Sequence, residues 1–248
     1  MNAEPSASAR TTASRRRQGK PEQLTLSYRT WGGSRKGAGR KAGPKPPIPH
    51  RPRKPLNPRH PVHVTLRVRR DVPNLRSQVM LAALGRAFAG ARGRFGMRLV
   101  HFSVQGNHLH LLVEADSAQA LSRGMAGLGI RMARRLNGAI GRRGAAFAER
   151  YHAQVIENPR QARHALRYVL LNARLHALRE DPVGARRGPV LFDPCSSARC
   201  FDGWQDGARD AGHAPCGEPS TLVMPAQTWL LRVGWRLWGS IDPSGLRA

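Results

Sequence analysis

Two short apolar runs meet at a turn between residues 97 and 115, and this segment constrains the fold more than any other. It reads MRLVHFSVQGNHLHLLVEA, in which Gly106-Asn107 is a turn pair between two strands. Successive side chains point to opposite faces of a strand. His108 and His110 therefore project to one face, and the leucines beside them project to the other. The segment predicts a β-hairpin with two imidazoles on one face of its second strand.

Periodicity on both sides of the hairpin predicts the remaining elements. We expect a strand over 60–68, a helix from about 74, the hairpin, a basic helix from 116 or 117, a strand within 145–158 and a helix over 160–178. The order is β-α-β-β-α-β-α. Its first six elements are those of a ferredoxin-like split βαβ sandwich, an α+β fold with an antiparallel sheet backed by helices. The seventh is an added C-terminal helix that carries Tyr168.

The net charge indicates the kind of partner. The chain carries 42 Lys and Arg against 15 acids, a formal charge of +27, and 35 of these cations lie in residues 1–180 with 8 acids. Such an excess points to a polyanion, most commonly nucleic acid. No apolar stretch is long enough for a membrane span, and the N-terminus lacks an apolar signal core. We expect no membrane partner and a cytoplasmic, nucleoid-associated protein.

Composition divides the chain into three regions. Residues 1–59 hold fifteen Lys and Arg and two acids among many Pro, Gly and Ser, which predicts a basic disordered arm that binds nucleic acid. The alternative is a tail that only solubilises. Residues 60–180 hold the predicted elements and form the expected catalytic domain. Residues 181–248 are a loop-rich extension.

Cationic side chains of the arm and of the second helix are the predicted DNA contacts. A solvated helix face is the alternative interpretation of the helical ones. The predicted set is Arg35, Lys36, Arg40 and Lys41 in the arm, with Arg123, Arg131, Arg134, Arg135 and Arg150 further on.

The extension carries the three cysteines and a tryptophan-rich segment. An odd number of cysteines without zinc-site spacing is typical of free thiols in a reducing compartment. Trp229, Trp235 and Trp238 lie in PAQTWLLRVGWRLWGSI, which we expect to pack against the domain. Stacking of one of these rings on a DNA base is the alternative.

The last helix supplies the partners for the two histidines. Tyr168 and Asn172 are four residues apart, so they share a helix face. Tyr168 lies away from the apolar stripe of that helix, which disfavours a core role. A divalent cation held by His108, His110 and the Asn172 oxygen would polarise a scissile phosphate. Mixed nitrogen and oxygen ligands suit Mg²⁺ or Mn²⁺.

A phenol, a carboxamide and two histidines form a set suited to phosphodiester chemistry. Tyr168 would attack phosphorus and form a tyrosyl–DNA linkage, which releases a 3′ hydroxyl. The linkage conserves the bond energy, so that a hydroxyl can reverse the step and rejoin strands without ATP. The set predicts a nicking and joining enzyme.

These motifs resemble those of the single-tyrosine HUH transposases of small insertion sequences. The match consists of His-hydrophobe-His on a central strand and a following Tyr-x-x-x-amide helix, over roughly residues 60–180. The basic extensions and RYHA before the tyrosine helix are closest to the REP-associated tyrosine transposases. The wider family often has Gln where this chain has Asn172.

The resemblance implies a function and a set of roles. His108, His110 and Asn172 match the metal ligands, and Tyr168 matches the nucleophile. The implied activity is metal-dependent cleavage and transfer of single-stranded DNA through a 5′-phosphotyrosine intermediate, at hairpins or repeats. Family members include monomers and dimers, so a homodimer is open. The alternative function is a non-catalytic, domesticated DNA-binding protein; a basic RNA-binding protein would need aromatic residues on the sheet.

Other side chains are weaker candidates for the same roles. Tyr151 is an alternative nucleophile, but it lacks a partner amide. His164 and His176 flank Tyr168 at helical spacing and are alternative ligands. Glu114 could supply a carboxylate, and Asp116 is expected to cap the helix that follows.

Overall fold

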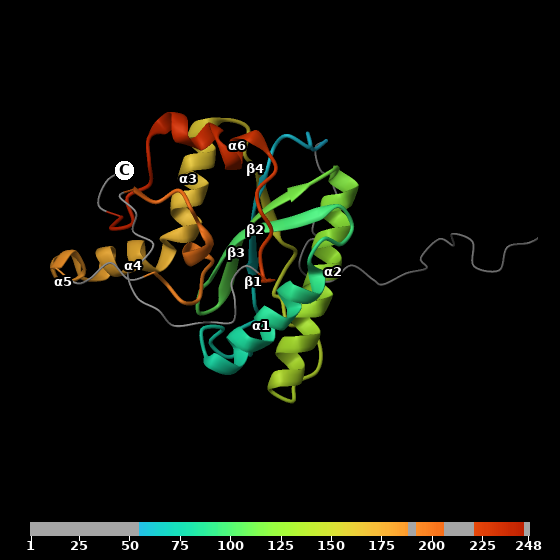
Figure 1. The fold of residues 1–248 in the computed structure, drawn as a ribbon. Coiled ribbons are helices and arrows are strands. Elements are labelled where there is room, and N and C mark those ends of the chain that lie inside the picture. The colour runs from blue at the N-terminus through green and yellow to red at the C-terminus, as the bar shows by residue number, and fades with distance from the viewer. Residues whose placement is uncertain (1–54, 188–191, 206–220, 246–248) are drawn as a thin grey trace, which may run out of the picture. The chain divides into compact units, whose positions relative to one another are not determined.

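One antiparallel sheet of four strands organises the protein (Figure 1). The computed structural model describes residues 55–187, 192–205 and 221–245. The strands, β1 (Val62–Arg67), β2 (Met97–Val104), β3 (His108–Ala115) and β4 (His152–Val155), lie in the order β2-β3-β1-β4. Helices α1 (Gln78–Ala91) and α2 (Ala118–Ala139) connect them. This arrangement confirms the predicted α+β fold with a ferredoxin-like order.

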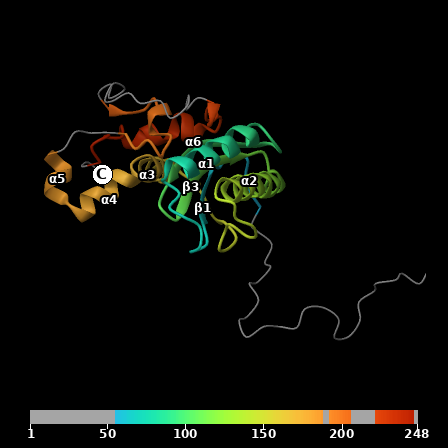
Figure 2. The ribbon, with the colours of Figure 1, turned by 90° about the horizontal axis from the view of Figure 1, so that it is seen from below.

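Helices α1 and α2 cover one face of the sheet (Figures 1 and 2). Alternation on β1 and β3 directs Val62, Val64, Leu109 and Leu111 into this layer, where none has exposed surface. The rest of the layer comes mainly from the buried stripes of the two helices. Burial of these side chains is the main stabilisation of the fold.

Helix α1 begins later than the sequence predicts. Asn74 lies in a turn, where its side-chain Oδ1 accepts a hydrogen bond from the Arg76 backbone N–H at 2.9 Å. The helix then begins at Gln78, with Val79 56% exposed and Ala83 buried.

The opposite face of the sheet is covered by α3 (Pro159–Leu170) and by the C-terminal extension. The extension contributes α6 (Trp229–Arg232) and the short 3-10 helix η4 (Gly234–Trp238). Trp235 is buried in this second apolar cluster, together with Leu112 of β3 and Leu166 of α3. Trp229 and Trp238 are each 54% exposed. The tryptophan-rich segment therefore packs on the domain through one ring of three.

The single helix predicted over 160–178 is two helices. Leu171, with φ −108° and ψ 13°, separates α3 from α4 (Asn172–Glu180), and α5 (Pro182–Arg187) follows. Four consecutive residues, 169–172, are buried, and they would occupy most of the circumference of a straight helix. A change of direction lets the chain bury all four.

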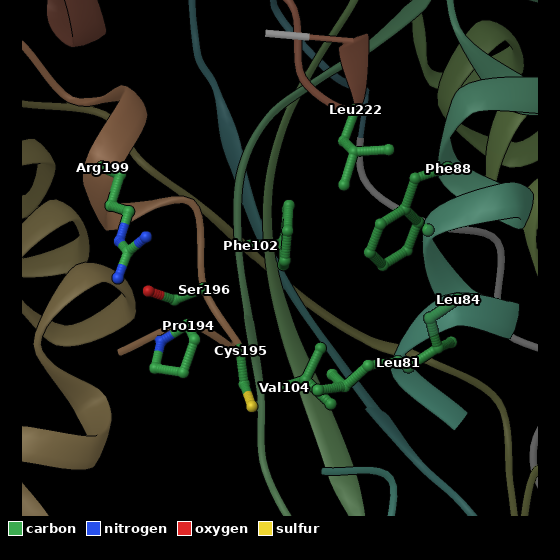
Figure 3. Close-up of a pocket in the computed structure, with 11 residues that line it drawn as sticks. Leu81, Leu84, Phe88, Phe102, Val104, Pro194, Cys195, Ser196, Arg199 and Leu222 are labelled. Atoms are coloured by element: carbon green, nitrogen blue, oxygen red, sulfur yellow. The ribbon is translucent and has the colours of Figure 1, made fainter. Parts of the chain in front are cut away.

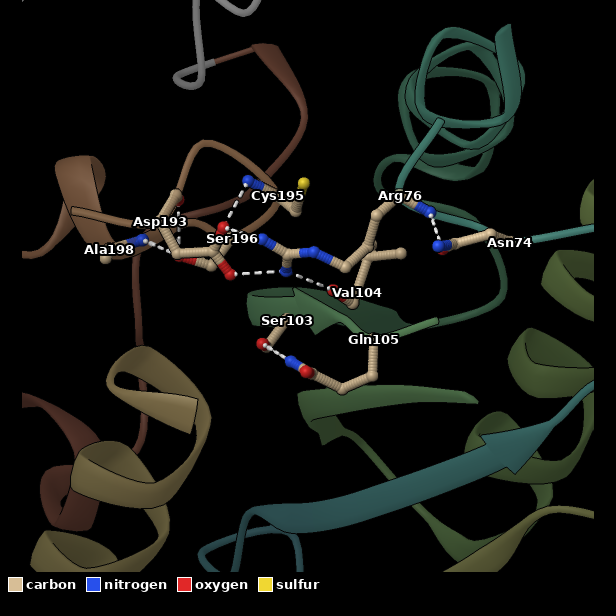
Figure 4. Close-up of polar contacts among 9 residues, drawn as sticks. All are labelled: Asn74, Arg76, Ser103, Val104, Gln105, Asp193, Cys195, Ser196 and Ala198. Carbon is tan, nitrogen blue, oxygen red and sulfur yellow. Dashed lines mark hydrogen bonds and ion pairs between the residues drawn. The ribbon is translucent and has the colours of Figure 1, made fainter. Parts of the chain in front are cut away.

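The extension also protects the edge of the sheet at β2. The Val104 backbone N–H donates to the Cys195 carbonyl at 2.8 Å, and the Ser197 N–H donates to the Phe102 carbonyl at 3.0 Å. Next to these bonds, Arg76 makes a two-point ion pair with Asp193 at 2.7 and 2.8 Å (Figure 4). Covering an edge strand removes a template for pairing with other chains.

An apolar cavity of about 30 Å³ lies between α1, β2 and the extension (Figure 3). Phe88 and Phe102 line it from the domain, and Cys195 and Leu222 line it from the extension. The space is small, so the contact between the domain and the extension is closely packed. Among the described helices, none is both long and apolar enough to cross a bilayer.

Candidate active site

Strands β1 and β3 place three histidines on the face away from α1 and α2. His110 lies opposite Thr65 in the register of the two strands, and His108 lies opposite Arg67. The rings of His108 and His110 are 4.8 Å apart between centroids. His63 of β1 lies diagonally across from His110, with centroids 5.2 Å apart.

Helix α3 carries Tyr168 over this histidine face. The Tyr168 hydroxyl is 3.5 Å from Nε2 of His110, and the two rings meet edge to face at 5.0 Å. The tyrosine ring also lies 5.8 Å from the ring of His63. Tyr168 remains 38% exposed, so a polynucleotide can reach it from solvent. The structure thus brings together the predicted tyrosine and the predicted histidine pair.

Each ring of the pair has a partner at its Nδ1 atom. Nδ1 of His108 lies 2.7 Å from Oδ1 of Asn107, which can only accept, so His108 donates from Nδ1. The lone pair of His108 is therefore on Nε2. Nδ1 of His110 lies 3.2 Å from Nε2 of His63 and 3.3 Å from Oγ1 of Thr65.

His63, Thr65 and Asn107 were not among the residues expected from the sequence. A signal was present for His63 and Thr65, because they alternate with the core residues Val62, Val64 and Leu66. The histidine-bearing face of the neighbouring strand is the face they must share. Only the pairing register, which the sequence leaves open, shows that they reach His110.

The three imidazoles are held in the neutral form. Burial, with the charge of His152 as a smaller cause, lowers the pKa of His63 to about 4. Burial, followed by repulsion from His63, His108 and His176, lowers the pKa of His110 to about 3. Burial also lowers the pKa of His108. Neutral imidazoles retain the lone pair that metal coordination requires.

Asn172 does not share an uninterrupted helix with Tyr168, because the chain turns at Leu171. Its side chain is 1% exposed, and neither its oxygen nor its nitrogen has a hydrogen-bond partner among the described residues. His176 lies one turn further along α4 and lowers the pKa of both His108 and His110 through its charge. Asn172 and His176 are four residues apart on α4 and so share a helix face.

The donor set fits a divalent cation with nitrogen and oxygen ligands. It offers two neutral imidazoles and a buried amide whose polar atoms are unpaired, which is costly unless a ligand satisfies them. Among the described residues, no group of three or more His, Cys, Asp or Glu side chains could hold a metal ion. The amide oxygen of Asn172 is a buried acceptor without a hydrogen-bond partner, so it is the candidate third ligand.

Most of the predicted DNA-binding arginines lie away from this site. Arg123, Arg131, Arg134 and Arg135 are on α2, which packs on the opposite face of the sheet through Leu121 and Met132. Arg150 is exposed just before β4. The arm residues Arg35, Lys36, Arg40 and Lys41 lie outside the described residues.

The weaker candidates have other surroundings. Tyr151 packs against the apolar layer of α1 and α2, on the far side of the sheet from His110. His164 is exposed on α3, one turn before Tyr168. Glu114 is fully buried and accepts hydrogen bonds from Gln227 and Thr228 of the extension.

The Asp116 carboxylate accepts a hydrogen bond from Nη1 of Arg98 at 3.2 Å, and Asp116 does not cap the helix that follows. Helix α2 is capped by Ser117, whose Oγ accepts from the Ala120 backbone N–H at 3.0 Å. Glu114 and Asp116 are thus engaged in structural contacts.

Comparison with known proteins finds a family whose model matches this domain. Residues 58–170 match the family described as transposase, IS200 like, and this range contains β1 to β4 and α3. The resemblance to the transposases of small insertion sequences is confirmed for this part of the chain. The family supports a DNA-processing enzyme with transposase activity. No curated protein matches the chain.

Two solved structures are similar to the chain at low identity. One is a REP-associated tyrosine transposase bound to a REP hairpin, with 15% identity, 55% of this chain and 77% of that chain covered, and a TM-score of 0.42. The other, from Deinococcus radiodurans R1, is described as a candidate transposase, with 16% identity, 49% and 88% covered, and a TM-score of 0.34.

Proposed function

We propose that the protein cleaves and transfers single-stranded DNA by way of a covalent tyrosyl intermediate. The observation that carries this proposal is the 3.5 Å approach of the Tyr168 hydroxyl to Nε2 of His110, on a face that also presents His108. The family match over residues 58–170 and the net charge of +27 support DNA as the substrate.

Tyr168 is the nucleophile in this proposal. Its hydroxyl oxygen attacks phosphorus and forms an oxygen–phosphorus bond, while the bond from phosphorus to the 3′ oxygen breaks. The phenolic proton leaves to solvent, and the departing 3′ oxygen takes up a proton to become a hydroxyl. The 5′ phosphate stays on Tyr168, and attack by a 3′ hydroxyl reverses the step and joins strands.

His108, His110 and Asn172 would hold Mg²⁺ or Mn²⁺. When bound, the ion would neutralise charge on the scissile phosphate in the transition state. The chain contributes orientation, since β3 fixes the two rings and α3 fixes the phenol relative to them. The Nε2 lone pair of His110 can serve the phenol proton or an ion but not both, so His110 would give up its contact with the Tyr168 hydroxyl if it served as a ligand.

The test is a covalent-trapping assay with a single-stranded hairpin. The DNA is labelled at its 3′ end in one sample and at its 5′ end in another, and each is incubated with Mn²⁺, Mg²⁺ or EDTA before a denaturing gel. We expect a metal-dependent adduct that carries the 3′ label and a shortened 5′-labelled strand. Tyr168→Phe should abolish both products, and the matched control Tyr151→Phe should retain them.

Either of two results would contradict the proposal. Tight DNA binding without an adduct, with either metal and on any hairpin, would favour the non-catalytic DNA-binding alternative. An adduct that persists in Tyr168→Phe would assign the nucleophile to another residue. A homodimer and specificity for repeats stay predictions that this assay does not address.

A further inference from the structure

His63 is a partly buried side chain that contacts both His110 and Tyr168, and the proposed reaction gives it no role so far. Its Nε2 atom lies 3.2 Å from Nδ1 of His110, and its ring contacts the rings of both His110 and Tyr168. It stands on β1, where Leu112 lies opposite it and His110 lies on the diagonal. The two rings are thus held together by the pairing of two central strands.

The position of the proton on His110 decides what this ring can do. A neutral imidazole donates from one nitrogen and accepts at the other. If Nε2 carried the proton, His110 could neither bind a cation nor accept a proton at the atom that faces Tyr168. If Nδ1 carries the proton, the lone pair points toward Tyr168.

We propose that His63 is a positioning residue that holds His110 in the form protonated at Nδ1. In this arrangement Nδ1–H of His110 donates to Nε2 of His63, and Thr65 Oγ1 at 3.3 Å is a second, longer acceptor. This role depends on the proposed function, because a lone pair on Nε2 matters only if His110 acts there as a metal ligand or as a base.

The other histidine of the pair supports this assignment. Nδ1 of His108 donates to Oδ1 of Asn107 at 2.7 Å, so that His108 also presents Nε2 as the free nitrogen. Both rings are therefore bonded at Nδ1 to a fixed side chain, one from the turn and one from β1. Metal-binding histidines commonly have such a partner at the second nitrogen, and its loss typically weakens metal binding about 10- to 100-fold.

Thr65 cannot fix this proton by itself. A hydroxyl rotates and can donate as readily as it accepts, so it is compatible with either form of His110. His63 can also be written with the proton on Nε2, donating to His110, and this second form is the competing arrangement. The two arrangements predict opposite protonation at all four nitrogen atoms of His63 and His110, and they can be distinguished by measurement.

The first test needs neither metal nor DNA. Nitrogen-15 spectra of the histidine rings at neutral pH show which nitrogen of each ring carries the proton. We expect Nδ1 to be protonated in both His110 and His63 of the full-length protein. A spectrum with His110 protonated at Nε2 would overturn the proposal, whatever the outcome of the trapping assay.

The second test measures the affinity for Mn²⁺ by calorimetry in the absence of DNA. His63→Phe keeps a ring and removes the acceptor, and we expect it to bind Mn²⁺ about 10- to 100-fold more weakly than the natural protein. His63→Gln offers an amide oxygen as acceptor and should recover part of the loss. The matched control is His101→Phe, which removes a buried histidine of β2 that hydrogen-bonds Ser197 and does not contact His110 or Tyr168.

The two proposals fail in different ways. Equal Mn²⁺ affinity in folded His63→Phe and in the natural protein would overturn the role of His63 while the trapping assay still stands. Thermal unfolding shows whether His63→Phe folds. If it does not fold, the Mn²⁺ affinity of His63→Gln is the deciding measurement. An affinity of His63→Gln as low as that of His108→Ala would overturn the role of His63. If the natural protein neither binds Mn²⁺ nor forms the adduct, the proposed function is overturned. The nitrogen-15 spectra would then be the remaining test of whether His63 holds His110 in the form protonated at Nδ1.

Discussion

The two faces of β3 differ in what their side chains must do. Toward α1 and α2, Leu109, Leu111 and Val113 have no exposed surface and contribute only volume to an apolar layer. Toward α3 and the extension, His110 contacts Tyr168, His108 packs against His110, and Glu114 at the far end anchors the extension. Neighbouring residues of β3 therefore have different tasks: Leu109 stabilises the fold, and His108 and His110 on either side of it belong to the proposed active site.

The largest expected effect is on adduct formation, and it is measured by comparing substitutions at the adjacent residues His108 and Leu109. His108→Ala removes a proposed ligand at a partly exposed site, so we expect adduct formation to fall about 10²- to 10³-fold with little change in the free energy of unfolding. Leu109→Ala leaves a cavity in the apolar layer and should lower that free energy by about 2–5 kcal/mol. Adduct assays of both variants and urea unfolding measure the two quantities.

The comparison of these two variants carries its own control. At a temperature where Leu109→Ala is fully folded, it should form the adduct at close to the natural rate, since Leu109 faces away from Tyr168. If Leu109→Ala lost the adduct as completely as His108→Ala, the two faces would not be separable in this way.

A smaller effect is expected at the structural end of the histidine face. Glu114 accepts hydrogen bonds from the backbone of Gln227 and Thr228 and from the Thr228 hydroxyl, and it pairs with Arg98 at 3.3 Å. Glu114→Gln removes the charge and turns a donor group toward these donors. We expect a loss of about 1.5–3 kcal/mol in the free energy of unfolding.

Hydrogen exchange shows where that loss falls. The amides of residues 227–231 should exchange faster in Glu114→Gln, while those of α1 keep their protection. Asp116→Asn is the control, because Asp116 is exposed and shares only Arg98 with Glu114. Unchanged exchange at Thr228 would show that the extension does not depend on the buried carboxylate.

The fold could be predicted from the sequence because its elements are defined by local patterns. Alternation over Val62 to Val68 and the turn at Gly106-Asn107 each require only neighbours along the chain. The break at Leu171 could not be predicted in this way. It arises from burial of four consecutive residues between the sheet and the extension, and periodicity within one helix contains no information about that contact.

The site could be predicted only in part for a similar reason. His108, His110 and Tyr168 belong to a spacing pattern, and the structure places them together. His63 belongs to no such pattern, since its contact with His110 depends on the register of β1 and β3. The extension is a further case, because its hydrogen bonds to the edge of β2 join residues more than ninety positions apart.

The smallest expected effect concerns the pH dependence of stability, and it tests whether burial on the histidine face keeps imidazoles neutral. Burial lowers the pKa of His101 to about 4, against a weaker opposing effect of Asp202. Between pH of about 6.5 and 4 the unfolded chain binds this proton and the folded chain does not, so stability falls as the pH falls.

His101→Phe removes that proton, and its unfolding free energy should fall less steeply, by up to about 1.4 kcal/mol per pH unit. Urea unfolding at pH 7, 6 and 5 measures the slope, with His164→Phe at an exposed position of α3 as the matched control. Equal slopes for His101→Phe and the natural protein would show that burial on this face does not exclude the proton, and the neutral state of His110 beside Tyr168 would then need another cause.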